Sequence, residues 1–148
     1  MSIVLPTKTV LYTIEQAIKE YRKCSQEYIS KEVLDITIDQ ALTLLLIDKN
    51  PESNQKELAD LIFKDYASMT RIIELIVRNG YLKRSTHPQD RRRYILSLTK
   101  KGKDTIEILE PIIEKNRNRA LAGLDDKQIM DLQTTLQSII DNCKANKS

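Results

Sequence analysis

The chain has little of what metal centres and catalytic sites are usually built from. Its 148 residues include one histidine, two cysteines, three glycines and no tryptophan. Cys24 and Cys143 lie near opposite ends and form no Cys-x-x-Cys pair, so a zinc site with the usual ligands is nearly excluded. There is no glycine-rich phosphate loop, and no grouping of nucleophile, base and oxyanion donors is visible, because the one histidine, His87, lies in the predicted hairpin turn. We therefore expect no enzymatic activity, no metal and no cofactor.

Long apolar runs are also missing. No segment approaches the roughly 20 consecutive apolar residues that cross a bilayer. The first residues, MSIVLPTKTVLY, have neither a basic n-region nor a small-residue cleavage site. An amphipathic membrane-surface helix is poorly supported by a chain with no tryptophan and one phenylalanine. With 41% hydrophobic and 30% charged residues, the composition predicts a helix-rich protein. From the missing membrane span and signal peptide we expect a cytoplasmic location and no membrane partner.

Positive charge is concentrated in one part of the chain. Residues 64–103 contain eleven lysines and arginines and three acidic residues, a net charge of +8, whereas the rest of the chain has a net charge of −5. This polarisation predicts a basic working surface on an acidic support, as in nucleic-acid-binding proteins.

The first part of the sequence predicts three helices. Residues 10–28 carry apolar side chains at intervals of three and four, the pattern of a long amphipathic helix. Thr37 and Gln40 have the spacing of a capping box that opens a second helix. Asn54 and Glu57 predict a similar reciprocal cap for a short third helix.

The middle of the chain predicts a winged helix. A fourth helix starts after Asp65 and stops at Gly80, which suits a left-handed C-cap. Only residues 63–64 separate it from the third helix, as in a helix-turn-helix. The period then changes to two in YLKRST and RRYILSL, on either side of HPQD, which predicts a two-stranded hairpin.

Two further helices complete the predicted fold. Thr99 caps the fifth, in which Pro111 predicts a kink or a restart. Gly123 ends it, and Asp125 and Gln128 cap the sixth. The terminal helices are too apolar to stand alone, and they have only each other or a second chain to pack against.

The expected fold class is mainly α with a small β-hairpin wing, a winged helix-turn-helix with a helical dimerisation domain. Residues 1–34 would form an N-terminal dimerisation helix. Residues 35–99 would form the winged helix-turn-helix lobe, and residues 100–148 the C-terminal dimerisation helices.

The fourth helix has the features of a recognition helix. Projected at 100° per residue, one side carries Met69, Ile72, Ile73 and Ile76 and should face the core. The other side carries small side chains and an arginine, which allow close approach to a major groove. The candidate DNA contacts are Tyr66, Ala67, Ser68, Thr70 and Arg71. Taken alone, a plain solvated face explains this pattern at least as well.

The hairpin turn supplies a second basic element. THPQDRRRY places Arg91, Arg92 and Arg93 at an exposed tip, and arginine is favoured in narrow minor grooves. Asp90 would hold one of these arginines in a bidentate pair; the alternative is that it is an ordinary turn residue. His87 could contact phosphate, although exposed turn histidines usually contribute little.

These residues resemble the MarR family of bacterial transcriptional regulators. Leu82-x-Arg84, Asp90-x-Arg92 and Leu98-Thr99-x-x-Gly102 are similar to the wing signature of the family. The similarity extends upstream through KELADLI and MTRIIELIVRNGYL, and downstream through Pro111 and LAGLDDKQ. It therefore covers nearly the whole chain.

The resemblance implies a homodimer that binds double-stranded DNA. The recognition helix would enter the major groove and the wing the minor groove, with Arg92 as the inserted arginine and Asp90 as its support. Because arginines flank Arg92 on both sides, which of them enters the groove stays open. The resemblance also implies release of DNA on binding a small aromatic effector or on oxidation of a cysteine.

Three alternatives remain beside a ligand-responsive repressor that binds a pseudo-palindromic operator. Cys24 lies between two tyrosines on one helical stripe and could be a redox sensor, but a core role is favoured, because no lysine or arginine on that face would lower its pKa and cysteines on apolar stripes are usually part of the core. The winged helix could instead dock an acidic protein. Single-strand or RNA binding is disfavoured because few aromatic residues lie in the basic region.

Overall fold

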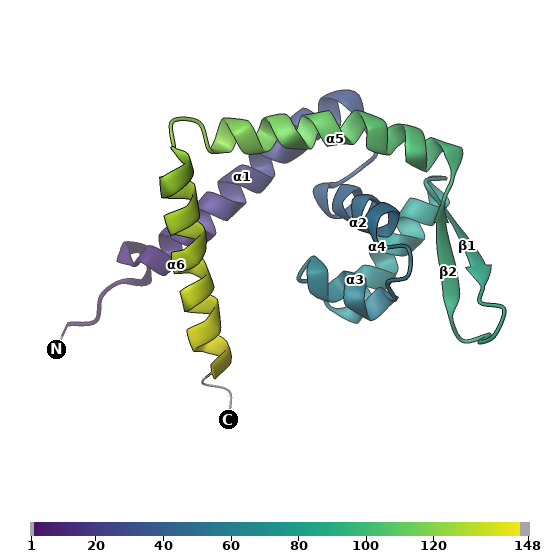
Figure 1. The fold of residues 1–148 in the computed structure, drawn as a ribbon, viewed down its shortest axis with the longest axis horizontal. Coiled ribbons are helices and arrows are strands. Elements are labelled where there is room, and N and C mark those ends of the chain that lie inside the picture. Colours follow the sequence, from purple (N-terminus) through teal and green to yellow (C-terminus); the bar gives the residue numbers. More distant parts are fainter. Residues whose placement is uncertain (1, 146–148) are drawn as a thin grey trace. The chain divides into compact units, whose positions relative to one another are not determined.

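The computed structural model describes residues 2–145 (Figure 1). Within them it contains a short 3-10 helix, six α-helices and one antiparallel hairpin, which confirms the expected fold class. In order these are η1 (Pro6–Lys8), α1 (Val10–Glu32), α2 (Ile38–Lys49), α3 (Gln55–Leu61), α4 (Tyr66–Arg78), β1 (Leu82–Thr86), β2 (Tyr94–Leu98), α5 (Lys100–Ala120) and α6 (Asp126–Ala145). No helix in residues 2–145 has the length and hydropathy required of a membrane span.

The predicted N-caps define where most helices begin. Thr37 and Gln40 form the complete capping box of α2, with reciprocal hydrogen bonds of 3.2 and 3.1 Å. Asn54 caps α3 by accepting from the Glu57 N–H, but its side chain, and not its main chain, contacts the Glu57 carboxylate. The first helix continues to Glu32, beyond the predicted residue 28, because the apolar stripe extends to the buried Ile29.

Two helices end in the same C-terminal motif, with different residues in the left-handed position. At the end of α4 this residue is Gly80, as predicted, with φ of 84°. At the end of α3 it is Phe63, with φ of 60°. There the Lys64 N–H donates to the Ala59 carbonyl at 2.9 Å, the bond that closes a Schellman motif. A non-glycine residue costs about 1–2 kcal/mol in this conformation, so the helix-turn-helix turn is held in place by its surroundings.

The core lies between α2, α3, α4 and the base of the hairpin, and it also takes in the end of α1 and the first part of α5. Its most deeply buried apolar side chains are Ile29, Leu44, Leu58, Met69, Ile73, Ile76, Tyr81, Leu82 and Leu109. Burying a side chain of this size stabilises the fold by about 1.5–3 kcal/mol. This core fixes α3 and α4 with respect to each other and leaves the opposite face of α4 in solvent.

The hairpin is joined to α5 at a close backbone contact. Thr99 accepts from the Gly102 N–H at 3.0 Å and donates to the Gly80 carbonyl at 2.6 Å. Gly102 itself lies so near the Tyr81 carbonyl that a Cβ atom would be 2.2 Å from that oxygen. The helix then runs through Pro111 without interruption, so a restart there is wrong.

The described chain divides into two compact units. The first extends through Asn116 and contains the winged helix-turn-helix lobe together with α1. The second begins at Arg117 and contains the end of α5 and all of α6. Asp125 and Gln128 cap α6 reciprocally, as predicted, with bonds of 2.8 and 2.9 Å.

Candidate nucleic-acid interface

The start of α4 presents the predicted recognition residues to solvent. Asp65 caps the helix by accepting from the Ser68 N–H at 2.7 Å, and this hydrogen bond lowers the pKa of the Asp65 carboxyl. Tyr66, Ala67 and Ser68 are exposed, as is Arg71 one turn later. On the opposite side the residues predicted to face the core do so: Met69, Ile73 and Ile76 are buried, and Ile72 is half-buried.

Thr70 is less available for DNA contacts than the other candidate residues of this helix. Its hydroxyl donates to the Tyr66 carbonyl at 3.0 Å and accepts from Gln55 Nε2 at 2.6 Å. Gln55, the first residue of α3, thus fixes the Thr70 rotamer and lies beside the recognition face. Sequence reasoning missed Gln55, because a contact between residues fifteen positions apart leaves no periodic signal.

The turn before α4 carries an unusually exposed apolar side chain. Phe63 is 93% exposed and occupies the left-handed position described above. Tyr66, three residues later, is also largely exposed. An apolar side chain in a strained, solvent-exposed turn beside the recognition helix was not foreseen.

The wing forms as predicted, with one correction. β1 and β2 pair in register from Leu82 with Leu98 to Thr86 with Tyr94, and the hairpin projects from the lobe in Figure 1. The Asp90 carboxylate accepts from the Arg92 main-chain N–H at 3.0 Å, and within residues 2–145 it pairs with no arginine side chain. The expected bidentate pair is therefore absent, and Asp90 shapes the turn, because the carboxylate of an Asx turn bonds the main chain two residues ahead.

The wing arginines differ in what they contact. Arg91, Arg92 and Arg93 all lie exposed around the turn. Arg84 stacks over the ring of Tyr94, with its guanidinium carbon 5.1 Å from the ring centroid, a cation–π geometry. His87 Nδ1 accepts from the Gln89 N–H at 3.1 Å, so His87 helps to close the turn. The exposed end of the hairpin thus presents a cluster of positive charge.

The base of the wing is anchored at Tyr81. Its ring is buried, and its hydroxyl donates to the Asp35 carboxylate. Burial, reinforced by the neighbouring Asp35 charge, raises the pKa of Tyr81 well above its usual range. Lys101 lies over the Tyr81 ring, 4.3 Å from the centroid, and donates to the Asn79 carbonyl at 2.7 Å. These contacts join the α1–α2 loop, the wing and α5.

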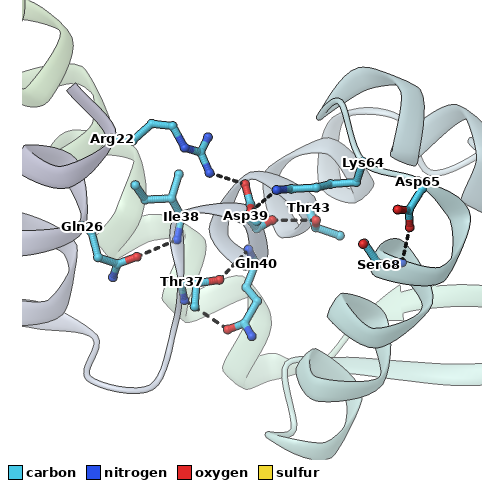
Figure 2. A network of polar contacts seen from close by, with 10 residues as sticks. All are labelled: Arg22, Gln26, Thr37, Ile38, Asp39, Gln40, Thr43, Lys64, Asp65 and Ser68. Carbon is cyan, nitrogen blue, oxygen red and sulfur yellow. Dashed lines mark hydrogen bonds and ion pairs between the residues drawn. The ribbon is translucent and has the colours of Figure 1, made fainter. Parts of the chain in front are cut away.

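A polar network joins α1 to the lobe (Figure 2). On one side Gln26 of α1 accepts from the Ile38 N–H at 2.9 Å and donates to the Ile36 carbonyl at 3.1 Å, at the start of α2. On the other side Asp39 of α2 pairs with both Arg22 and Lys64. Neither contact was predicted, because each pairs residues on different elements.

The remaining candidates do not form a chemical site. Cys24 is half-buried on α1 and Cys143 is exposed on α6. Among residues 2–145, no three histidine, cysteine, aspartate or glutamate side chains are grouped closely enough to hold a metal ion.

The sequence is similar to transcriptional regulators. A model of the MarR family matches residues 34–93. The HTH-type transcriptional regulator BilQ of Clostridium symbiosum is 30% identical over 96 residues, which are 65% of this chain and 67% of that protein. The HTH-type transcriptional regulator SarZ of Staphylococcus saprophyticus is 29% identical over 126 residues, 85% of this chain and 81% of that one.

Solved structures of low sequence identity share the fold. A structure of BpsR from Bordetella bronchiseptica, which concerns regulation of its DNA binding by 6-hydroxynicotinic acid, has a TM-score of 0.83 and 19% identity, and covers 95% of this chain and 99% of that one. A variant of MarR from Escherichia coli in complex with operator DNA has a TM-score of 0.81 and 21% identity, and covers 93% and 99% of the two chains.

Proposed function

Because the chain belongs to the MarR family and is a transcriptional regulator with a DNA-binding winged helix, we propose that it reads a specific double-stranded operator as a homodimer. The observation that carries this proposal is the pairing of two exposed elements on one lobe. The start of α4 offers small and polar side chains, and the wing offers clustered arginines.

The two elements take different parts in binding. The exposed side chains at the start of α4 contact base edges or phosphates in the major groove; these are Tyr66, Ala67, Ser68 and Arg71. Gln55 fixes the Thr70 hydroxyl, which makes one further contact with the DNA. The wing provides the minor-groove contact through Arg91, Arg92 and Arg93, and Arg92 is the inserted residue. Arg84 lies against the adjacent sugar-phosphate backbone of the DNA. Asp90 supports this contact by fixing the backbone of the turn, because its bond to the Arg92 N–H sets the direction of that residue.

Dimerisation would use the ends of the chain. The N-terminal segment and α1 expose a series of apolar side chains, Ile3, Val4, Leu5, Val10, Leu11 and Ile18. Within α6, Met130, Leu132 and Ile140 are exposed as well. Clusters of this kind mark interaction surfaces. Residues 1–34 and 100–148 then form the dimerisation domain and residues 35–99 the DNA-binding lobe. Two-fold symmetry predicts a pseudo-palindromic operator with half-sites about one helical turn apart.

We propose further that a small aromatic effector regulates DNA binding. The fold neighbour from B. bronchiseptica, whose DNA binding is regulated by 6-hydroxynicotinic acid, supports an effector of this chemical class. Occupancy of the operator would fall when the effector binds, as expected of a ligand-responsive repressor that acts in the cytoplasm.

Fluorescence anisotropy tests the proposed function. The probes are a duplex selected from a random library by the protein and a shuffled duplex of the same composition, each titrated at two salt concentrations. A preference of about 10³-fold or more for the selected duplex that survives at physiological salt is expected of a sequence reader. Equal binding to both duplexes that disappears at physiological salt would contradict the proposal and favour docking of an acidic protein.

A further inference from the structure

Asp39 uses its two carboxylate oxygens to join two elements that belong to different parts of the fold (Figure 2). One oxygen, Oδ1, accepts from Arg22 Nη2 of α1 at 2.6 Å. The other, Oδ2, lies 3.1 Å from Lys64 Nζ in the turn between α3 and α4. A single carboxylate on α2 therefore links the proposed dimerisation helix to the helix-turn-helix turn.

This ion triad is better shielded than the other ion pair of α1. The Asp39 side chain is 18% exposed and its partners Arg22 and Lys64 are 41% and 36% exposed, whereas the side chains of the Glu15–Lys19 pair are 68% and 74% exposed at a separation of 3.8 Å. Burial raises the pKa of Asp39, but the hydrogen bonds from Arg22 and Lys64 outweigh it, so the pKa lies below its ordinary value. The carboxylate stays charged at neutral pH, and because it is itself largely shielded from solvent, its two ion pairs are screened less than a fully exposed pair is.

Lys64 lies at the start of the recognition helix, where a small shift of the backbone would move the whole helix relative to the DNA. It directly precedes Asp65, the N-cap of α4, and directly follows Phe63 with its left-handed backbone. A strained turn persists only when neighbouring contacts hold it. The ion pair with Asp39 is such a contact, so it fixes the position from which the recognition helix starts.

The other end of the triad lies on a helix that is itself fixed to the lobe. Gln26, four residues after Arg22 and thus one turn along α1, is bonded to the main chain on both sides of Thr37. The junction of α1 and α2 is thereby held at two neighbouring points. Of these two, only the Arg22 contact continues through Asp39 to the turn before α4.

We propose that Arg22 and Asp39 are positioning residues for operator recognition, which set the start of the recognition helix relative to α1 through Lys64. The inference rests on the DNA-binding function proposed above. Neither residue contacts DNA in this arrangement. Their effect falls on discrimination between sequences, because base readout depends on helix placement and non-specific attraction depends mainly on charge.

The test compares Arg22→Gln with Lys19→Gln. Both variants remove one positive charge from α1, but only the first breaks the triad. Binding is measured by anisotropy at four salt concentrations, to the duplex selected by the wild-type protein and to its shuffled control. Arg22→Gln should lower the ratio of the two affinities about tenfold, within the range of coupling between residues in contact, and should leave the salt dependence unchanged. Lys19→Gln should change neither.

A second comparison separates positioning from simple loss of stability. Asp39→Asn keeps the shape of the side chain but weakens both ion pairs, so it should lower the ratio at least as much as Arg22→Gln does. The double variant should lose no more than Asp39→Asn alone. Arg22→Lys, which keeps the charge, should retain part of the ratio. Circular dichroism at the assay temperature confirms that each variant is folded, and if Arg22→Gln is not, Asp39→Asn decides alone.

The outcomes distinguish the inference from the function on which it rests. Unchanged ratios in Arg22→Gln or in Asp39→Asn would overturn the inference, as would additive losses in the double variant. A salt slope reduced by about one in Arg22→Gln would show that Arg22 contacts phosphate directly and would also overturn it. Absence of any preference in the wild-type protein would refute the proposed function itself.

Discussion

Replacing Gly102 with alanine is expected to destabilise the fold, although alanine is the better helix former. Inside α5 the exchange should gain about 1 kcal/mol from intrinsic helix propensity. The added Cβ atom, however, would lie 2.2 Å from the Tyr81 carbonyl oxygen and 3.2 Å from Leu98 Cδ2. A main-chain carbonyl cannot rotate away as a flexible side chain can, so the helix or the wing must move.

The expected cost follows from what that movement disturbs. Overpacking at a well-packed site costs about 1–3 kcal/mol. The Tyr81 carbonyl also accepts from the Thr99 N–H at 3.1 Å, and weakening that bond adds about 1 kcal/mol. After the gain in propensity is subtracted, a net loss of about 1–3 kcal/mol remains. The close approach thus gives a physical reason for a glycine in the Leu-Thr-x-x-Gly part of the wing signature.

Urea unfolding followed by circular dichroism checks this expectation. Wild type, Gly102→Ala and Lys103→Ala are compared at one fixed protomer concentration, because the stability of an oligomer depends on concentration. Lys103 is the exposed neighbour in the same turn, and its replacement should change the unfolding free energy by less than about 0.5 kcal/mol. If Gly102→Ala proves as stable as wild type, or more stable, the packing argument fails.

Three further results are expected. Arg92→Ala should weaken binding to the selected duplex by about 1–3 kcal/mol and reduce its salt dependence, measured by anisotropy beside Arg91→Ala and Arg93→Ala; identical effects of all three would argue against one inserted arginine. The stability difference between wild type and Asp39→Asn should be fully present above about pH 4 and shrink as the pH falls further, because the folded-state pKa of Asp39 lies below its unfolded value; a difference that grows on acidification in urea titrations would contradict this sign. Cys24→Ser should retain DNA binding and the same response to peroxide as wild type, since Cys24 is half-buried on an apolar stripe; loss of a peroxide response in the variant would instead establish a redox switch.

Features that depend on neighbours in sequence could be predicted. Thr37, Asp65 and Gly80 each act through main-chain groups within a few residues, so their types and spacing were sufficient to place the helix ends. The hairpin could be predicted for the same reason, because its alternation and its turn are local. The apolar side of α4 followed from a period of 3.6 residues.

Features that depend on distant partners could not be predicted. Asp39 shows no pattern that points to Arg22 or Lys64, and Gln55 none that points to Thr70. The contact of Asp90 could not be predicted, because two local bonds compete for its carboxylate. An ion pair with an exposed arginine gains little in water, whereas the bond to the Arg92 N–H satisfies a main-chain donor without ordering a long side chain.

Hydroxyl-radical footprinting on the selected duplex tests most directly whether α4 and the wing read DNA together as a dimer. The account predicts two protected segments about one helical turn apart, related by two-fold symmetry, with protection in the flanking minor grooves. Arg92→Ala should lose the flanking protection and keep the central pattern. A single asymmetric segment, protection spread evenly along the duplex, or an unchanged pattern in Arg92→Ala would contradict it.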